Sequence, residues 1–429
     1  MKKIHLFFAL VLFVIPVAAQ IRGNNIEISV YPDHNDWTYK VGETAKFTVE
    51  VRKSGSLMPD ATIDYEAGPS LYPNVKKKSV VLKDGTMKWS GGMKTPGFYT
   101  LKVRTTVNGK AYESQCTAGF SPEKIEPATK CPKDFDQFWS ETLASARKND
   151  LNPTRRLLPE RCTKDVNVYE VSFVNNRPDS RIFGILCIPV KPGKYPALLR
   201  VPGAGVRPYG GDVFTASQGA ITLEIGIHGI PVTMEQQVYD LMLPGCLDNY
   251  WETNLDQPEK NYYRRVVTGA VRAVDYIASL PEWNGTSLGV TGSSQGGFLS
   301  LATAALDKRV TFLGAVHDAM CDYESELNGI AGGWPHYFLN KETVDMKKVE
   351  GARYYDGVNF ARRITCPGWY SFGYNDEVVP PQSSYGTYNV VTAPKTLSLY
   401  QKTGHFWYQE QWDEWEAWLL SQMGIKTEK

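Results

Sequence analysis

The chain has 429 residues, of which 42% are hydrophobic and 22% charged, so the composition supports two or three packed domains and excludes wholesale disorder. The formal net charge is +1, which gives no basis for a nucleic-acid partner or for binding to an anionic membrane surface. None of the seven cysteines shows C-x-x-C spacing, and we predict no metal and no organic cofactor.

The first 19 residues have the features of a secretory signal peptide. Lys2 and Lys3 precede an uninterrupted apolar run, residues 6–15, that is too short to span a bilayer. Small residues follow, and they suit cleavage after Ala19. We therefore expect a periplasmic or secreted protein without a membrane span once residues 1–19 are removed.

Residues 20–121 alternate apolar and polar side chains with the period of two that β-strands require. The alternation is clear at 47–51 and 99–103, and turn signals such as Asn108-Gly109 separate the expected strands. We predict a small immunoglobulin-like β-sandwich that serves for packing or as a spacer. The alternative is a carbohydrate-binding module that uses exposed aromatic side chains such as Trp37 or Trp89.

A polar segment with two prolines, residues 122–130, is interpreted as the linker to a catalytic domain at 131–429. In that domain strands and helices alternate, which indicates a mostly parallel sheet with helices on both faces. The pattern predicts a long helix at 261–280 and strands at 181–190, 197–201, 220–224, 287–291, 310–316 and 369–372. Three tryptophans on the terminal helix are interpreted as packing residues: Trp412, Trp415 and Trp418.

The segment Gly292-Ser293-Ser294-Gln295-Gly296 lies between a predicted strand and a predicted helix. A G-x-S-x-G motif in this context forms a sharp turn that holds its central serine clear of the sheet edge, and the glycines leave room for that turn. Ser294 is therefore the predicted nucleophile. The alternative is an ordinary loop in which Ser293 or Ser294 caps the following helix.

A serine hydroxyl needs a neighbouring base, and the base needs an acid that orients it. In hydrolases with this turn the acid and the histidine follow the serine along the chain. His405 lies in the last loop before the terminal helix and is the predicted base. The predicted acid is Asp376, after the strand at 369–372, with Glu377 and then Asp356 as rivals.

The developing oxyanion needs backbone N–H donors that are fixed before the reaction. One predicted donor is Gln295, which follows the nucleophile at the start of a helix. The other is Ala204, in the loop Pro202–Gly205 after an early strand, because small neighbours let the backbone approach a substrate. A metal cluster of His228, Glu224 and His317 is a remote alternative.

Several segments together resemble the acetyl xylan esterase / cephalosporin-C deacetylase family. These are residues 132–139, 262–274, 290–297, 354–361 and 373–381, with Tyr388-Asn389, Lys395 and Gly404-His405. The resemblance covers about residues 131–425 and implies an α/β-hydrolase that removes acetyl groups from acetylated sugars, with the triad on Ser294, Asp376 and His405. Two segments differ: Pro202–Gly205 replaces an H-G-Y-G-type sequence, and Gly226-Ile227-His228 replaces the usual R-G-Q motif.

We predict a secreted serine carboxylesterase that hydrolyses acetyl esters on acetylated xylan or xylo-oligosaccharides through an acyl-enzyme. The alternatives are an esterase or peptidase of the same fold with a different acyl substrate, and a non-catalytic carbohydrate-binding protein. The cysteines allow several pairings, with Cys246 and Cys321 as candidates in loops, and the oligomeric state stays open.

Overall fold

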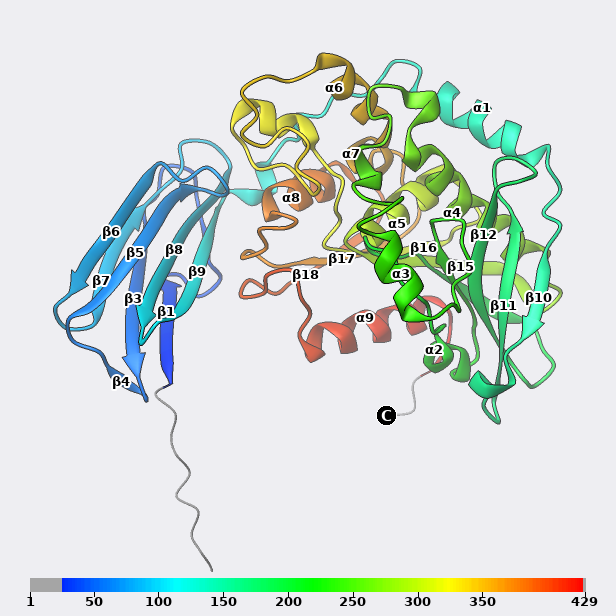
Figure 1. Cartoon of the computed structure of the whole chain (residues 1–429), viewed down its shortest axis with the longest axis horizontal. Helices are drawn as coiled ribbons and strands as arrows, with labels where there is room; N and C mark the ends of the chain where they lie inside the picture. Colours follow the sequence, from blue (N-terminus) through cyan, green and yellow to red (C-terminus); the bar gives the residue numbers. More distant parts are fainter. Residues whose placement is uncertain (1–24, 427–429) are drawn as a thin grey trace, which may run out of the picture.

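Two β-sheets face each other across one hydrophobic core in the N-terminal part of the chain (Figure 1). The computed structural model describes residues 25–426, so the predicted signal peptide lies outside the described residues. The first sheet contains β1 (Ile26–Pro32), β3 (Ala45–Lys53), β4 (Ser56–Leu57) and β7 (Thr86–Gly91). The second has the order β2 (Thr38–Tyr39), β9 (Lys110–Phe120), β8 (Gly97–Val107), β5 (Ala61–Pro69) and β6 (Val75–Leu82).

The predicted alternation is present in this β-sandwich. Along β3 every second side chain from Ala45 to Val51 is fully buried, and the residues between them face outward. Trp37 is only 7% exposed, and Trp89 packs against the core and donates a hydrogen bond to the Tyr99 hydroxyl at 3.1 Å. Neither tryptophan is therefore an exposed aromatic surface. The assignment of the sandwich to the immunoglobulin type stays a prediction.

The second domain is built on a nine-stranded sheet of the order β10-β11-β12-β14-β13-β15-β16-β17-β18. The pairs from β10 to β14 are antiparallel, and all pairs from β14 to β18 are parallel, which confirms the predicted mostly parallel sheet. The strands are β10 (Thr154–Leu157), β11 (Val166–Val174), β12 (Arg181–Pro189), β13 (Tyr195–Arg200), β14 (Ile221–Gly226), β15 (Trp283–Ser293), β16 (Phe312–Val316), β17 (Gly368–Phe372) and β18 (Lys395–Leu399).

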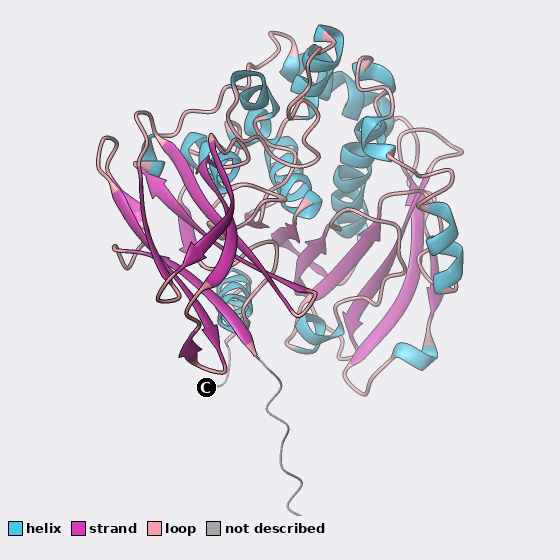
Figure 2. Ribbon diagram, turned by 60° about the vertical axis from the view of Figure 1, so that its left-hand side comes forward, coloured by secondary structure: helices cyan, strands magenta, loops and turns pink. Residues whose placement is uncertain are grey.

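Helices cover both faces of this sheet (Figures 1 and 2). One face carries α1 (Phe135–Arg147), α4 (Tyr262–Ser279), α5 (Gln295–Leu306) and α7 (Gly357–Ala361), and the other carries α2 (Val213–Ser217) and α9 (Gln409–Gln422). The remaining helices, α3 (Gln236–Met242), α6 (Met346–Ala352) and α8 (Pro381–Val390), lie in the connections between strands.

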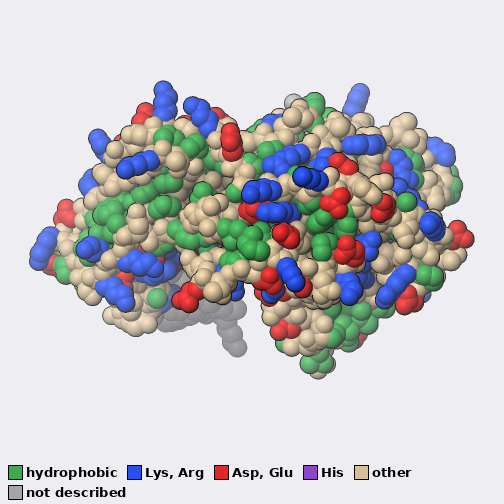
Figure 3. Space-filling model, turned by 90° about the horizontal axis from the view of Figure 1, so that it is seen from above, with side chains coloured by type: hydrophobic (Ala, Val, Ile, Leu, Met, Phe, Trp, Pro, Cys, Tyr) green, Lys and Arg blue, Asp and Glu red, His purple; other side chains and the backbone are tan. Residues whose placement is uncertain are grey.

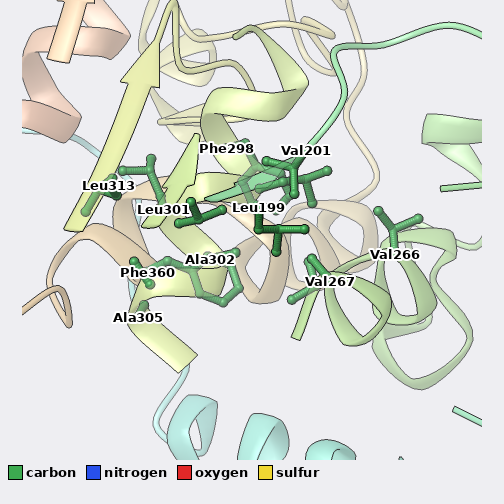
Figure 4. Close-up of a cluster of buried hydrophobic side chains, with 14 of the residues drawn as sticks. Leu199, Val201, Val266, Val267, Phe298, Leu301, Ala302, Ala305, Leu313 and Phe360 are labelled. Carbon is green, nitrogen blue, oxygen red and sulfur yellow. The ribbon is translucent and has the colours of Figure 1, made fainter. Parts of the chain in front are cut away.

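Helix α5 is buried along almost its whole length, which fixes the turn that precedes it. Its residues from Gln295 to Ala305 are all buried. Figure 4 shows Phe298, Leu301 and Ala302 packed among apolar side chains of β13, α4, β16 and α7. A helix that is apolar on every side has no freedom to slide without opening cavities, so it is a rigid support.

The predicted linker is packed against the catalytic domain. The Thr129 backbone N–H donates to Asp322 at 3.0 Å, and its hydroxyl donates to Asp356 at 2.7 Å. Pro122 is buried as well. The segment connects the two domains, with Pro122 and Thr129 buried, whereas Glu123, Lys124, Glu126 and Lys130 remain exposed.

All seven cysteines are free thiols in the structure; Cys321 is buried and Cys246 is exposed, so these two do not pair. Between residues 25 and 426 no helix combines the length and the apolar character needed to cross a bilayer. Positive and negative side chains are interspersed on the face shown in Figure 3, in keeping with the near-neutral composition.

Candidate active site

The predicted nucleophile, Ser294, lies at the sharp junction between β15 and α5. Its φ of 61° and ψ of −125° are unusual for a residue with a side chain, so the surrounding structure must hold it there. Its N–H donates to the Val316 carbonyl of the neighbouring strand at 2.9 Å. A Cβ atom at either Gly292 or Gly296 would lie 2.5 Å from the Val201 carbonyl oxygen, which explains why both positions require glycine.

The predicted acid and base contact each other at the carboxyl ends of the parallel strands. Asp376 lies in the loop after β17 (residues 373–380, the acid loop), and His405 lies in the loop before α9 (residues 400–408, the histidine loop). His405 Nδ1 and Asp376 Oδ2 are 2.8 Å apart. The other carboxylate oxygen accepts from the backbone N–H groups of Val378 and Val379 at 2.9 and 2.8 Å.

Ser294 and His405 line the same cavity, which has a volume of about 640 Å³. The structure therefore brings the three predicted side chains to one place. The rival acids are engaged elsewhere. Glu377 forms an ion pair with Lys102 at 2.7 Å, and Asp356 accepts from the Val358 N–H at the start of α7.

A second histidine, His317, approaches the same carboxylate. It follows β16 directly, has a left-handed φ of 47°, and is 1% exposed. Its Nδ1 lies 3.2 Å from Asp376 Oδ2, although neither ring nitrogen has a well-directed hydrogen bond to the residues that the structure describes. The ring centroids of His317 and His405 are 5.2 Å apart. The sequence suggested His317 only as a remote metal ligand and did not predict its contact with Asp376.

These surroundings keep Asp376 ionised. Burial alone would raise the pKa of the carboxyl group, but the contacts with His317 and His405 outweigh it and lower the pKa from 3.8 to about 2. Nitrogen and oxygen atoms of His317, His405 and Asp376 lie within 4.8 Å of one another, a spacing that a metal ion can bridge. The remote cluster of His228, Glu224 and His317 does not assemble, because His228 is bound to Tyr262 and Gly205 and His317 contacts Asp376.

The amides of Gln295 and Ala204, the predicted oxyanion donors, are both unused by the described part of the chain. Neither N–H donates a hydrogen bond to any residue between 25 and 426. The next amide, Gly205, donates to the Tyr250 hydroxyl at 3.3 Å and is occupied. Gly203 lies against the nucleophile: a Cβ atom there would be 3.9 Å from Ser294 Cβ. The Pro202–Gly205 loop thus presents open backbone donors beside Ser294.

The Gln295 side chain joins this loop to the nucleophile turn. It is fully buried, and its Nε2 donates to the Pro202 carbonyl at 3.2 Å. Its Oε1 accepts from the hydroxyls of Tyr250 and Tyr263 at 2.7 and 2.8 Å. Because one side chain holds both segments that carry the open amides, the distance between those amides is fixed before a substrate arrives.

His228, which replaces part of the R-G-Q motif, supports the loop from its other end. Its Nε2 is 3.0 Å from the Gly205 carbonyl oxygen, and its Nδ1 is 2.7 Å from the Tyr262 hydroxyl. Burial is the main cause that lowers the pKa of His228 from 6.5 to about 4. A neutral ring fits both contacts, since Nε2–H then donates to the carbonyl and Nδ1 accepts from the tyrosine.

The β-sandwich holds the acid loop on both sides of Asp376. Gln115 of β9 donates its amide N–H to the Asn375 carbonyl at 2.9 Å, and Asn375 Nδ2 returns a hydrogen bond to the Gln115 carbonyl at 3.3 Å. Lys102 of β8 pairs with Glu377 at 2.7 Å. The two neighbours of the predicted acid are therefore fixed by the other domain.

Apolar contacts reinforce this junction. The Tyr374 ring meets Phe98 of β8 edge to face at 5.0 Å between centroids. Phe372, Tyr374 and Tyr385 belong to the same hydrophobic cluster as the sandwich core. The core of the sandwich thus continues into the strand, loop and helix that surround Asp376.

Tryptophans form part of the wall of the catalytic cavity. Trp334, Trp407, Trp412 and Trp415 all line it. Trp407 and Trp412 stack with 4.2 Å between ring centroids, and Trp412 is 38% exposed. The interpretation of the terminal-helix tryptophans as packing residues holds for Trp415, which is buried although it borders the cavity, and for Trp418, which packs against the core. Trp412 is more exposed and lines the cavity.

A family profile and a curated protein match this chain over most of its length. The profile of the acetyl xylan esterase (AXE1) family matches residues 123–421. The acetyl esterase Axe7A of Xylanibacter ruminicola is 40% identical over 398 residues, which cover 91% of this chain and 90% of that protein.

Two solved structures share the α/β-hydrolase fold of the catalytic domain. The acetyl xylan esterase from Paenibacillus sp. R4 is 24% identical with a TM-score of 0.60, over 70% of this chain and 98% of that one. Acetyl xylan esterase 1 from Thermoanaerobacterium sp. JW/SL YS485 is 22% identical with a TM-score of 0.61, over 70% of this chain and 97% of that one. With the family profile matched over residues 123–421, the chain belongs to the acetyl xylan esterase family and is a serine ester hydrolase.

Proposed function

We propose that the protein releases acetate from acetylated xylan or its fragments through a Ser294–His405–Asp376 triad. The observation that carries this proposal is the strained Ser294 beside two open amides, in the same cavity as a histidine whose Nδ1 is bound to a buried carboxylate. The family and the relative named an acetyl esterase support the class of ester.

In the first half-reaction the Ser294 hydroxyl attacks the acetyl carbonyl carbon, and His405 Nε2 accepts the hydroxyl proton. Asp376 holds the Nδ1–H and stabilises the imidazolium that forms, without taking the proton itself. The Gln295 and Ala204 amides bind the oxyanion. His405 then gives its proton to the departing sugar oxygen, and the acetyl group stays on Ser294.

In the second half-reaction water replaces the sugar. His405 accepts a proton from the water molecule as its oxygen attacks the acyl carbon, and the same two amides bind the second oxyanion. The proton returns to the serine oxygen and acetate leaves. Asp376 suits this cycle because its lowered pKa of about 2 keeps it charged throughout.

The walls of the cavity suit a sugar ester. The stacked Trp407 and Trp412 offer an apolar face to a sugar ring, and a volume of about 640 Å³ admits an acetyl group together with one or two sugar units. The basic residues Arg200 and Arg207 line the same cavity and can donate hydrogen bonds to sugar hydroxyls.

We further propose that the protein acts outside the cytoplasm, because residues 1–19 carry the features of a cleaved signal peptide. Acetylated xylan is a polymer that cells meet outside the membrane, so export and substrate are consistent.

The test is acetate release from acetylated xylo-oligosaccharides by the mature chain, residues 20–429, beside Ser294→Ala and the neighbouring Ser293→Ala. We expect release by the wild type and by Ser293→Ala, and loss of at least a thousandfold in Ser294→Ala. A fluorophosphonate probe should label the wild type but not Ser294→Ala. Activity that survives in Ser294→Ala would contradict the triad. Cleavage of p-nitrophenyl acetate without release from xylan fragments would refute the substrate and leave the triad in place.

A further inference from the structure

A second cavity lies between the two domains, beside the catalytic cavity. Its volume is about 870 Å³. The sandwich contributes side chains from β1, the turn after it and β9, and the catalytic domain contributes the acid loop and the histidine loop. Its lining includes Tyr31, His34, Gln115, Asn375, Lys402 and Phe406.

The two catalytic loops form the wall between the cavities. Gly404 and Phe406 line the interdomain cavity, whereas His405 and Trp407 line the catalytic cavity. In the acid loop, Glu377 lines the interdomain cavity and Val378 lines the catalytic cavity. A ligand that extends from the catalytic cavity over this wall therefore enters the interdomain cavity beside Gly404 and Phe406, the neighbours of His405.

The lining of the interdomain cavity has the chemistry that recognises sugars. Two aromatic rings are well exposed: Tyr31 of the sandwich at 42% and Phe406 of the histidine loop at 49%. Among them stand amide, imidazole and ammonium groups of His34, Gln115 and Lys402, which can bind hydroxyls. Sugar-binding surfaces combine apolar ring faces with a few such polar groups.

The carboxylates at this cavity do not give it a strong negative charge. Two carboxylates line it, Glu113 and Glu377, and both pair with Lys102, at 3.0 and 2.7 Å. Because these carboxylates are compensated, they present neither a cation site nor a strongly negative surface.

We propose that the interdomain cavity binds the sugar backbone of the same xylan chain whose acetyl group enters the catalytic cavity. This inference rests on the proposed function and extends it: the substrate is a polymer that crosses the histidine loop, and the β-sandwich supplies part of its binding site. Phe406 stands on the wall that the chain crosses, and Tyr31 contacts the chain from the other domain.

The test compares a polymer with a small ester. Tyr31→Ala removes a ring in the domain that carries no triad residue, and Tyr31→Phe keeps the ring while it removes the hydroxyl, which donates to Glu50 at 3.1 Å. Phe214→Ala is the matched control, since Phe214 is 59% exposed on α2 and lines neither cavity. For each variant kcat/KM is measured on acetylated xylan and on p-nitrophenyl acetate, and the ratio of the two is the readout.

We expect Tyr31→Ala to lower this ratio about three- to tenfold, through a higher KM for the polymer, and Phe406→Ala to do the same. Tyr31→Phe and Phe214→Ala should keep the wild-type ratio. An unchanged ratio in Tyr31→Ala, or an equal fall in Phe214→Ala, would overturn the inference.

A second measurement separates this inference from the proposed function. Retardation of the full chain in a gel that contains deacetylated xylan reports binding of the backbone without catalysis. Retardation that Tyr31→Ala weakens supports the inference even if the wild type releases no acetate from xylan. Wild-type release of acetate together with no retardation of any form would leave the esterase in place and overturn the interdomain site.

Discussion

Replacing Gln115 by alanine removes the side chain that holds the acid loop to the β-sandwich, and we expect turnover to fall while the fold stays intact. The lost contact is the 2.9 Å hydrogen bond from the Gln115 amide to the Asn375 carbonyl, directly before Asp376. The returning bond from Asn375 to the Gln115 backbone carbonyl is longer, at 3.3 Å, and remains possible in the variant.

The size of the effect follows from one hydrogen bond. Such a bond contributes about 0.5–1.5 kcal/mol. If all of that free energy keeps the acid loop in the conformation that orients His405, its loss lowers kcat about two- to tenfold. The KM for a small ester should change little, because Gln115 does not line the catalytic cavity.

The assay is steady-state hydrolysis of p-nitrophenyl acetate, together with urea unfolding of each variant. Thr105→Val is the matched control. Its hydroxyl donates to the Thr62 carbonyl at 2.7 Å inside the sandwich, so the variant loses a side-chain hydrogen bond to a backbone carbonyl that does not involve the acid loop. We expect Thr105→Val to lose a similar amount of stability and to keep its kcat.

Two results would refute the reasoning. Gln115→Ala with wild-type kcat would mean that the acid loop needs no support from the sandwich. A similar fall in kcat for Thr105→Val would mean that the sandwich affects catalysis only through general stability. A double-mutant cycle with Lys102→Met then measures whether the two anchors of the acid loop act together.

Three further outcomes follow from the site. Tyr250→Phe should lower kcat about tenfold, because it removes a hydrogen bond to Gln295 and leaves the Gly205 amide without its acceptor. Tyr263→Phe loses only the bond to Gln295 and should lower kcat less; equal losses in ester hydrolysis would contradict this. His317→Leu should raise the pKa of Asp376, which a 13C NMR titration of its carboxyl group measures directly. An unchanged pKa would mean that His317 does not stabilise the carboxylate. Burial lowers the pKa of His228 from 6.5 to about 4, so the contribution of the neutral ring to folding stability is complete above pH 6.5 and is lost as the pH falls to 4. In urea unfolding, the free energy of unfolding of the wild type should fall by about 3 kcal/mol more than that of His228→Gln over this range.

Although β10, β11 and β18 of the nine-stranded sheet were not predicted, local patterns were sufficient to predict its strands β12 to β17 and the candidates for the triad. The reason is that a parallel sheet with a strand–turn–helix at Ser294 brings successive strand ends to one edge, so residues in the loops after β17 and β18 meet the serine. The alternation along β3 likewise indicates which face of the strand is buried, without knowledge of the residues that pack against it.

The contacts that surround the triad could not be predicted in this way. His317 meets Asp376 because β16 and β17 are neighbours in a given register, and Gln115 meets Asn375 across 260 positions of sequence. The segment 122–130 was predicted only as a polar linker, yet Thr129 within it binds a buried carboxylate that lies 227 positions away. These contacts depend on how domains and strands pack, and no local period carries that information.

The shared core of the two domains also bears on how such a protein can be recombined. Phe372, Tyr374 and Tyr385 are buried against the sandwich, so cutting the chain between the domains would bare three aromatic rings beside the acid loop. The hydrolase domain therefore cannot simply be fused to another domain. A new partner would need a surface that covers those rings and replaces the hydrogen bonds to Asn375. For the same reason, we expect heating that unfolds the sandwich to release the loop that carries Asp376, the proposed acid.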